Sequence, residues 1–161
     1  MPLDPRRRNL LLASVAADVL ILDQVTKWFV QKNLPMHEVK SVLPFFNLTH
    51  VLNTGASFGM FQDSNRAFIG VTLAVLALLA FYAKKLLAEG FPTALGLALI
   101  TGGAVGNLAD RLRVGAVIDF LDFFWGVHHW PAFNVADSAI CVGVALMFFQ
   151  NLYGPKENAH S

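Results

Sequence analysis

The stretch that decides the fold is GFPTALGLALITGGAVGNLADR, residues 90–111. Its first 20 residues, 90–109, carry no charged side chain, and charges resume at Asp110 and Arg111. A helix of about 20 residues crosses the roughly 30 Å hydrocarbon layer of a bilayer, because each residue adds about 1.5 Å. The stretch therefore predicts a transmembrane helix that ends at a pair of charges.

Three further apolar stretches are long enough to cross a membrane, and they lie at about 10–30, 67–83 and 132–155. The first follows arginines at 6–8, as the apolar core of a removable signal peptide would. Its apolar pattern runs on past the small residues where cleavage would occur, so we expect a retained helix. The sequence predicts an all-α membrane protein, with residues 1–161 forming one domain of four transmembrane helices.

The composition is typical of a protein in contact with lipid. Apolar residues make up 55% of the chain and charged residues 14%, where soluble domains have about 45–50% and about 25%. Mean hydropathy is +0.53. The net charge of only +1 argues against a nucleic-acid partner, and the single cysteine, Cys141, excludes a disulfide within the chain. The five histidines lack the spacing of metal ligands, which argues against a metal site.

The orientation follows from the lysines and arginines that flank the spans. One end carries the cations at 6–8, 84–85 and 156, and the other carries Lys32, Lys40, Arg66, Arg111 and Arg113. The tight clusters lie at the first of these ends, which we expect to be cytoplasmic together with both termini. Residues of about 31–66 and 110–131 then form the outer segments.

Two parts of the outer segments have the pattern of extended chain. Residues 39–53 include a run that alternates apolar and polar side chains after Pro44, and residues 114–124 are rich in Val, Ile and Phe. We expect them to form a small outer sheet. The residues interpreted as anchors at the membrane interface are Trp125, His128, His129 and Trp130.

Polar side chains inside a membrane span are costly and are therefore candidates for function. Asp23 and Lys27 are four residues apart on one helical face and can neutralise each other. Gly102 and Gly106 have the spacing that lets another helix approach closely. Two sets of residues share a helical face near the outer ends of their helices. One set is Gly103, Asn107 and Asp110, with Arg111 one turn beyond Asn107, and the other is Asn134, Asp137 and Cys141.

Three carboxylates, Asp119, Asp122 and Asp137, fall near one membrane surface. Two carboxylates about 4 Å apart at an effective dielectric of about 20 repel by about 4 kcal/mol, which would raise the pKa of one of them by roughly three. One proton would then be shared, and such a pair can act as acid and base in an aspartic peptidase. The residues alone leave open a peptidase, a small proton-coupled transporter and a non-catalytic lipid-binding bundle.

Five blocks, in order along the chain, resemble the motifs of the bacterial lipoprotein signal peptidases, or signal peptidase II. They are DQVTK at 23–27, NTGA at 53–56, GGAVGNLADR at 102–111, VIDF at 117–120 and PAFNVADS at 131–138. The resemblance implies a four-helix aspartyl endopeptidase of the bacterial inner membrane, with a small periplasmic β-sheet cradle and an active site near the periplasmic surface. Such an enzyme cleaves diacylglyceryl-modified prolipoproteins before the lipidated cysteine, contacts membrane lipids and is inhibited by globomycin-type cyclic peptides.

The resemblance implies that Asp119 and Asp137 are the catalytic pair, which needs no cofactor. The supporting residues that it implies are Asp23, Lys27, Asn53, Asn107, Arg111 and Asn134. We expect Asn134 to orient a carboxylate or the scissile peptide, and Asn53 and Arg111 to hold the substrate backbone. Asp23 and Asp110 are expected to pair with Lys27 and Arg111, respectively. Asp18 departs from the family pattern, and we expect it to face the interior of the helix bundle.

Overall fold

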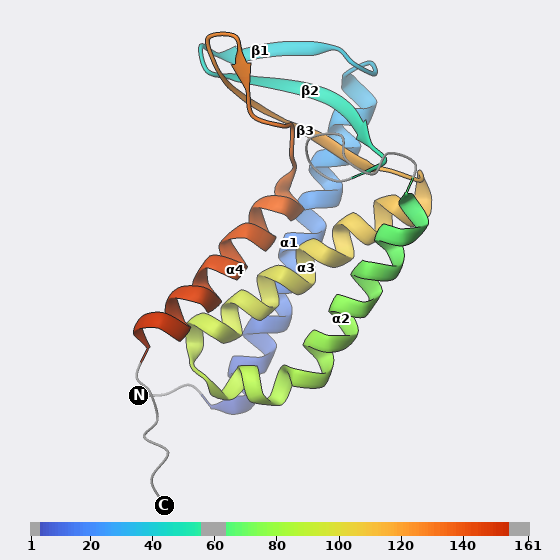
Figure 1. Cartoon of the computed structure of the whole chain (residues 1–161). Helices are drawn as coiled ribbons and strands as arrows, with labels where there is room; N and C mark the ends of the chain where they lie inside the picture. Colours follow the sequence, from blue (N-terminus) through green and yellow to red (C-terminus); the bar gives the residue numbers. More distant parts are fainter. Residues whose placement is uncertain (1–3, 56–63, 155–161) are drawn as a thin grey trace, which may run out of the picture.

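Four long helices carry a small sheet at one end of the molecule (Figure 1). The structure is a computed structural model that describes residues 4–55 and 64–154. Its helices are α1 (Pro5–Asn33), α2 (Asn65–Ala88), α3 (Phe91–Arg113) and α4 (Val135–Tyr153). Each is long and apolar enough to cross a membrane, which confirms the predicted four-helix membrane architecture.

Helix α3 lies at the centre of the bundle. Half of its apolar window is buried, whereas none of that of α2 is, and it packs against the other three helices. The predicted close approach occurs at two glycines that face α1. A Cβ added to Gly102 would lie 2.5 Å from the carbonyl oxygen of Ala16, and one added to Gly106 would lie 2.6 Å from the Asp23 carboxylate. The absence of side chains here brings Asp23 and its neighbours against α3.

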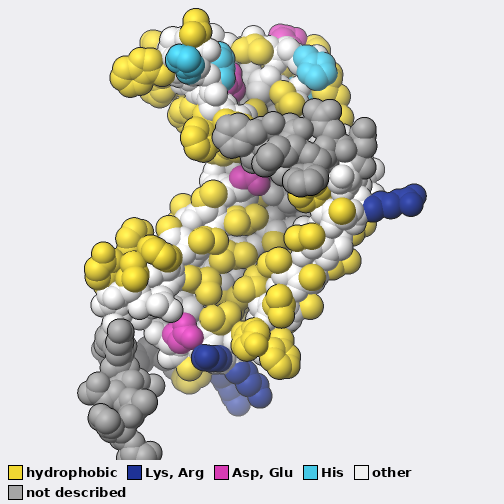
Figure 2. Space-filling view, in the orientation of Figure 1, with side chains coloured by type: hydrophobic (Ala, Val, Ile, Leu, Met, Phe, Trp, Pro, Cys, Tyr) yellow, Lys and Arg dark blue, Asp and Glu magenta, His cyan; other side chains and the backbone are white. Residues whose placement is uncertain are grey.

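The outer surface of the helices is apolar, as contact with lipid requires (Figure 2). Asp18 is an exception, because it is exposed near the middle of α1. The expectation that it faces the bundle interior is wrong. The buried positions of α1, which include Asp23 and Lys27, lie on a different face of the helix, about 140° from Asp18 at 100° per residue.

The sheet is antiparallel in the order β1-β2-β3-β4, which confirms the predicted small sheet. Its strands are β1 (Val39–Leu43), β2 (Phe46–Asn53), β3 (Val117–Trp125) and β4 (His128–His129). The expected extended segment 39–53 is a hairpin of two strands, because the chain turns at Pro44 and Phe45. Pairing of β2 with β3 places Val51 opposite Asp119 and Asn53 opposite Val117.

The sheet is fixed to the end of α1 and to the segment that leads into α4. Val30 and Leu34 form an apolar cluster with Phe120, and a ring nitrogen of His50 lies 2.8 Å from the Leu34 carbonyl oxygen. The carbonyl oxygen of Phe133 accepts hydrogen bonds from two backbone N–H groups of β3, at 3.0 and 2.8 Å. These contacts hold the start of α4 beside the middle of β3.

Candidate active site

Asp119 and Asp137, the predicted catalytic pair, line one hollow of about 220 Å³ at the junction of the sheet and the helices. Asp119 lies in β3 and is 2% exposed. Asp137 lies in the first turn of α4 and is partly exposed. Asn53, Asn107 and Arg111 line the same hollow. Residues from four separate elements therefore converge on one small polar space.

Asn134 links the two carboxylates. It is the N-cap of α4, where its Oδ1 accepts the backbone N–H of Asp137 at 2.8 Å. Its Nδ2 donates to Asp119 Oδ1 at 2.7 Å. The cap turns the amide oxygen toward the backbone N–H of Asp137, so the NH₂ group at the other end of the planar amide faces Asp119.

Asn53 holds the other oxygen of Asp119. Its Nδ2 donates to Asp119 Oδ2 at 3.0 Å, and its Oδ1 accepts the backbone N–H of Gly55 at 3.1 Å. The sequence predicts that Asn53 binds substrate backbone, and in the structure each end of its amide makes a hydrogen bond within this chain. Asn53 is therefore placed to orient Asp119.

Asn107 of α3 contacts Asp137 in a similar way. Its Nδ2 donates to Asp137 Oδ1 at 2.7 Å. Its Oδ1 accepts from the Lys27 ammonium at 2.9 Å, and Asn134 Nδ2 lies 3.3 Å from the same oxygen. Because an ammonium group can only donate, Lys27 holds the Asn107 oxygen and turns its NH₂ group toward Asp137.

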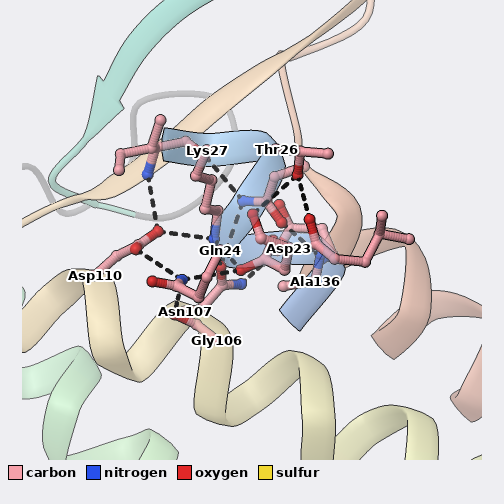
Figure 3. Close-up of polar contacts among 12 residues, drawn as sticks. Asp23, Gln24, Thr26, Lys27, Gly106, Asn107, Asp110 and Ala136 are labelled. Carbon is pink, nitrogen blue, oxygen red and sulfur yellow. Dashed lines mark hydrogen bonds and ion pairs between the residues drawn. The ribbon is translucent and has the colours of Figure 1, made fainter. Parts of the chain in front are cut away.

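Lys27 is the centre of a buried ionic cluster (Figure 3). Its Nζ lies 2.8 Å from Asp23 Oδ2 and 2.7 Å from Asp110 Oδ2, and the three side chains are 0% exposed. Gln24 donates to both carboxylates, at 3.2 and 3.0 Å. Asp23 also accepts the backbone N–H of Ala136 at 2.9 Å, so the cluster joins α1, α3 and the start of α4.

The partner predicted for Asp110 is wrong. Asp110 pairs with Lys27 and lies 3.5 Å from Arg113, one turn further along α3. Neighbouring residues of a helix point about 100° apart, so Asp110 and Arg111 face different sides of α3.

Arg111 joins the end of β2 to the start of α2. Its Nη2 donates to the Gly55 carbonyl oxygen at 3.0 Å, and its Nη1 lies 3.4 Å from Asn65 Oδ1. The guanidinium carbon also lies 4.5 Å from the ring centre of Phe68. Sequence reasoning missed Asn65 and Phe68, because neither belongs to a polar pattern or to a motif. Arg111 lines the hollow while its guanidinium is held mainly by this chain.

The electrostatic environment suits a shared proton. Burial raises the pKa of Asp119 from its ordinary 3.8 to about 7, and the nearby charge of Asp137 adds to this effect. Hydrogen bonds from Asn53 and Asn134 act in the opposite direction. A carboxyl group that titrates near neutral pH, next to a second one, can donate a proton while its neighbour accepts one.

Asp122, the third candidate carboxylate, lies away from this hollow. Its Oδ2 accepts from Asn47 Nδ2 at 2.9 Å, and its Oδ1 lies 2.8 Å from His129 Nδ1. Asp122 therefore joins three strands of the sheet. His129, interpreted as part of an interfacial belt, takes part in this cross-strand contact, while Trp125 and Trp130 are 88% and 64% exposed.

The fold that carries this junction is similar to that of solved bacterial membrane enzymes. A solved structure described as a bacterial membrane enzyme matches with a TM-score of 0.81 and 30% identity, covering 94% of both chains. A second of the same description matches with a TM-score of 0.77 and 30% identity, covering 90% of this chain and 94% of the other.

Sequence relatives give the family. The lipoprotein signal peptidase of Geobacter metallireducens is 49% identical over 137 residues, covering 83% of this chain and 85% of that protein. The lipoprotein signal peptidase of Shewanella baltica strain OS195 is 40% identical over 165 residues, covering 100% of this chain and 96% of the other. The family model of signal peptidase (SPase) II matches residues 15–153. The chain belongs to the signal peptidase II family, which confirms the resemblance and favours a peptidase over a transporter or a lipid-binding bundle.

Proposed function

We propose that this peptidase removes signal peptides from diacylglyceryl-modified prolipoproteins, and that Asp119 and Asp137 are its catalytic pair. The observation that carries the proposal is the hollow shared by the two carboxylates. Each accepts a hydrogen bond from an amide whose own oxygen is held by another donor. Such fixed donors orient both carboxylates before substrate binds.

The reaction uses water and the two carboxyl groups. The ionised carboxylate takes a proton from a water molecule, whose oxygen attacks the carbonyl carbon that precedes the lipidated cysteine. The protonated carboxyl gives its proton to the carbonyl oxygen, and a tetrahedral diol forms. The carboxyl group that received the proton from water then gives it to the amide nitrogen, the other carboxylate takes a proton from the diol, and the C–N bond breaks. The signal peptide leaves with a new carboxyl group, and the lipidated cysteine keeps a free amino group.

The supporting residues hold the carboxylates, directly or through a neighbour. Asn53 and Asn134 hold Asp119, and Asn107 holds Asp137. Lys27, neutralised by Asp23 and Asp110, holds Asn107. Arg111 fixes the backbone next to Asn53 through Gly55.

We place the enzyme in the bacterial inner membrane with its active site near the periplasmic surface and both termini in the cytoplasm. The clusters at 6–8 and 84–85 belong to the ends of α1 and α2 that lie away from the sheet (Figures 1 and 2), and clustered cations favour the cytoplasmic side. Membrane lipids contact the exposed apolar side chains. A globomycin-type cyclic peptide would compete with substrate at the hollow.

The test is cleavage of a prolipoprotein by the purified protein in lipid or detergent. The substrate is offered with its cysteine diacylglyceryl-modified and, as the control, unmodified. We expect the modified precursor to yield a signal peptide and a product that begins at the lipidated cysteine, with the same rate in EDTA. Failure to cleave the modified precursor, or loss of cleavage in EDTA that zinc restores, would contradict the proposal.

A further inference from the structure

A second hollow adjoins the candidate active site. Its volume is about 410 Å³, and it is lined by Trp130, Pro131, Ala132, Phe133, Asp137, Ser138, Ile140 and Cys141. We call it the α4 groove. Ala132 and Asp137 line both hollows, so the groove begins at a catalytic candidate. Figure 2 shows the molecule narrowing between the sheet and the helices, where an acidic side chain is visible.

The two hollows differ in chemistry. The smaller one is lined mainly by carboxylate, amide and guanidinium groups. Beyond Asp137, the α4 groove is lined mainly by apolar side chains. Cys141 is exposed and lies four residues beyond Asp137, which is one helical turn and about 6 Å further along α4. The groove therefore leads from the carboxylates toward the hydrocarbon layer.

We propose that the α4 groove binds an acyl chain of the substrate's diacylglyceryl group, an inference that rests on the proposed function. The diacylglyceryl group is joined to the sulfur of the cysteine that follows the scissile bond. When the scissile carbonyl lies beside Asp137, the glycerol is a few bonds away and its chains must enter the membrane close by. The α4 groove is an apolar surface that is continuous with Asp137.

The groove is short for the helical part of a signal peptide. One turn of an α-helix with its side chains is about 10 Å wide and 5.4 Å long, and it fills roughly 420 Å³. The α4 groove could therefore hold about one turn of a helix, whereas an acyl chain is a single file of methylenes. Transfer of that chain from lipid to the groove exchanges one apolar surface for another, so the groove favours binding through close packing of its side chains against the chain.

Cys141 makes the proposal testable, because it is the single cysteine of the chain. The Asp119→Asn protein, which should bind substrate without cleaving it, is treated with a maleimide in detergent micelles. The labelling rate is compared with no precursor, with diacylglyceryl-modified precursor and with unmodified precursor. We expect the modified precursor to slow labelling of Cys141 by about fivefold or more, as burial of an exposed thiol does, and the unmodified one to leave it unchanged.

The second measurement uses turnover by the otherwise unaltered enzyme. Cys141 is labelled with methyl or with octyl methanethiosulfonate, and each sample is compared with the same protein before labelling. We expect the octyl group to raise KM for the modified precursor about tenfold with kcat little changed, because it removes binding and not chemistry. The matched control carries Cys141→Ala and Val142→Cys. Val142 is 53% exposed at nearly the same depth on another face of α4, and its octyl label should not change KM.

The outcomes separate this proposal from the proposed function. Equal protection by both precursors would mean that peptide occupies the groove, and protection by neither would mean that no substrate does. Either result overturns the inference, as does an octyl label with no effect on KM. Cleavage of the modified precursor by the unlabelled enzyme would still support the function in all three cases. An unlabelled enzyme that cleaves nothing would instead overturn the function and this inference together.

Discussion

Replacement of Asp119 by Asn should abolish cleavage and stabilise the folded protein at alkaline pH. The side chain is 2% exposed, and burial next to Asp137 raises the pKa of Asp119 to about 7. The ordinary value is 3.8. The folded state therefore binds one more proton than the unfolded state between about pH 4 and pH 7, and the wild-type stability falls as pH rises through that window.

The magnitude follows from the difference between the two pKa values. It is about three pH units at 1.36 kcal/mol each, so the ionised Asp119 costs the folded state about 4 kcal/mol at pH 8. An Asn removes this cost but turns an NH₂ group toward a donor, either Asn53 or Asn134. A donor left without an acceptor costs about 1–3 kcal/mol. The net gain at pH 8 should be about 1–3 kcal/mol, and at pH 4 it should vanish or change sign.

The assay is thermal unfolding of the purified wild type and Asp119→Asn proteins in one detergent at pH 4 and pH 8. A change of 1 kcal/mol shifts Tm by about 2–4 °C for a chain of this length, so we expect the variant to melt about 3–9 °C higher at pH 8. Asp122→Asn is the control, because Asp122 lies outside the shared hollow and bonds Asn47. The reasoning would be refuted if the variant melted at a lower temperature than the wild type at pH 8, or if its Tm differed from that of the wild type by the same amount at both pH values.

Three other predictions concern the supporting residues and the orientation in the membrane. Asn53→Ala should lower kcat by one to two orders of magnitude, about 1.4–2.7 kcal/mol, with little loss of Tm, because it releases one oxygen of Asp119. The control, Lys40→Ala on exposed β1, should lower kcat much less. If activity is lost only in proportion to the unfolded fraction, Asn53 has a structural role. Lys27→Met should destabilise the fold by about 3–5 kcal/mol in denaturation experiments, because it leaves two buried carboxylates without their cation; an unchanged midpoint would mean that the cluster contributes nothing. Reporters fused to the C-terminus or inserted near Glu89 should report cytoplasm, and an external C-terminus would reverse the orientation.

The helices and the sheet could be predicted from the sequence because their signals are local. An uncharged run of 20 residues, such as 90–109, has few structures open to it other than a membrane helix. Pro44 stops a helix, but the alternation around it does not show whether one strand or two are formed. The hairpin is made by the turn at Pro44 and Phe45 and by pairing of β1 with β2, and β2 also pairs with β3, which lies far away in sequence.

The candidate site was predictable in its residues but not in all its pairings. The motif blocks contain Asp119, Asn53 and Lys27, yet sequence spacing gives no partner for a side chain that reaches another element. Asp110 pairs with Lys27 because of the approach of α1 to α3 at Gly106, and Asn53 turns to Asp119 because of strand register. At Asp18 the expectation from the sequence is wrong. A charged residue within a membrane span indicated burial in the bundle, but its face of α1 points outward.

The most direct test of the central claim is turnover of a diacylglyceryl-modified prolipoprotein by Asp119→Asn and by Asp137→Asn, each matched to the wild type in expression and in folded fraction. Both variants keep the size of the side chain but cannot exchange a proton with water or with the leaving amine. We predict that neither yields detectable signal peptide while Asp122→Asn remains active. Normal turnover by Asp119→Asn or by Asp137→Asn would contradict the assignment of the catalytic pair.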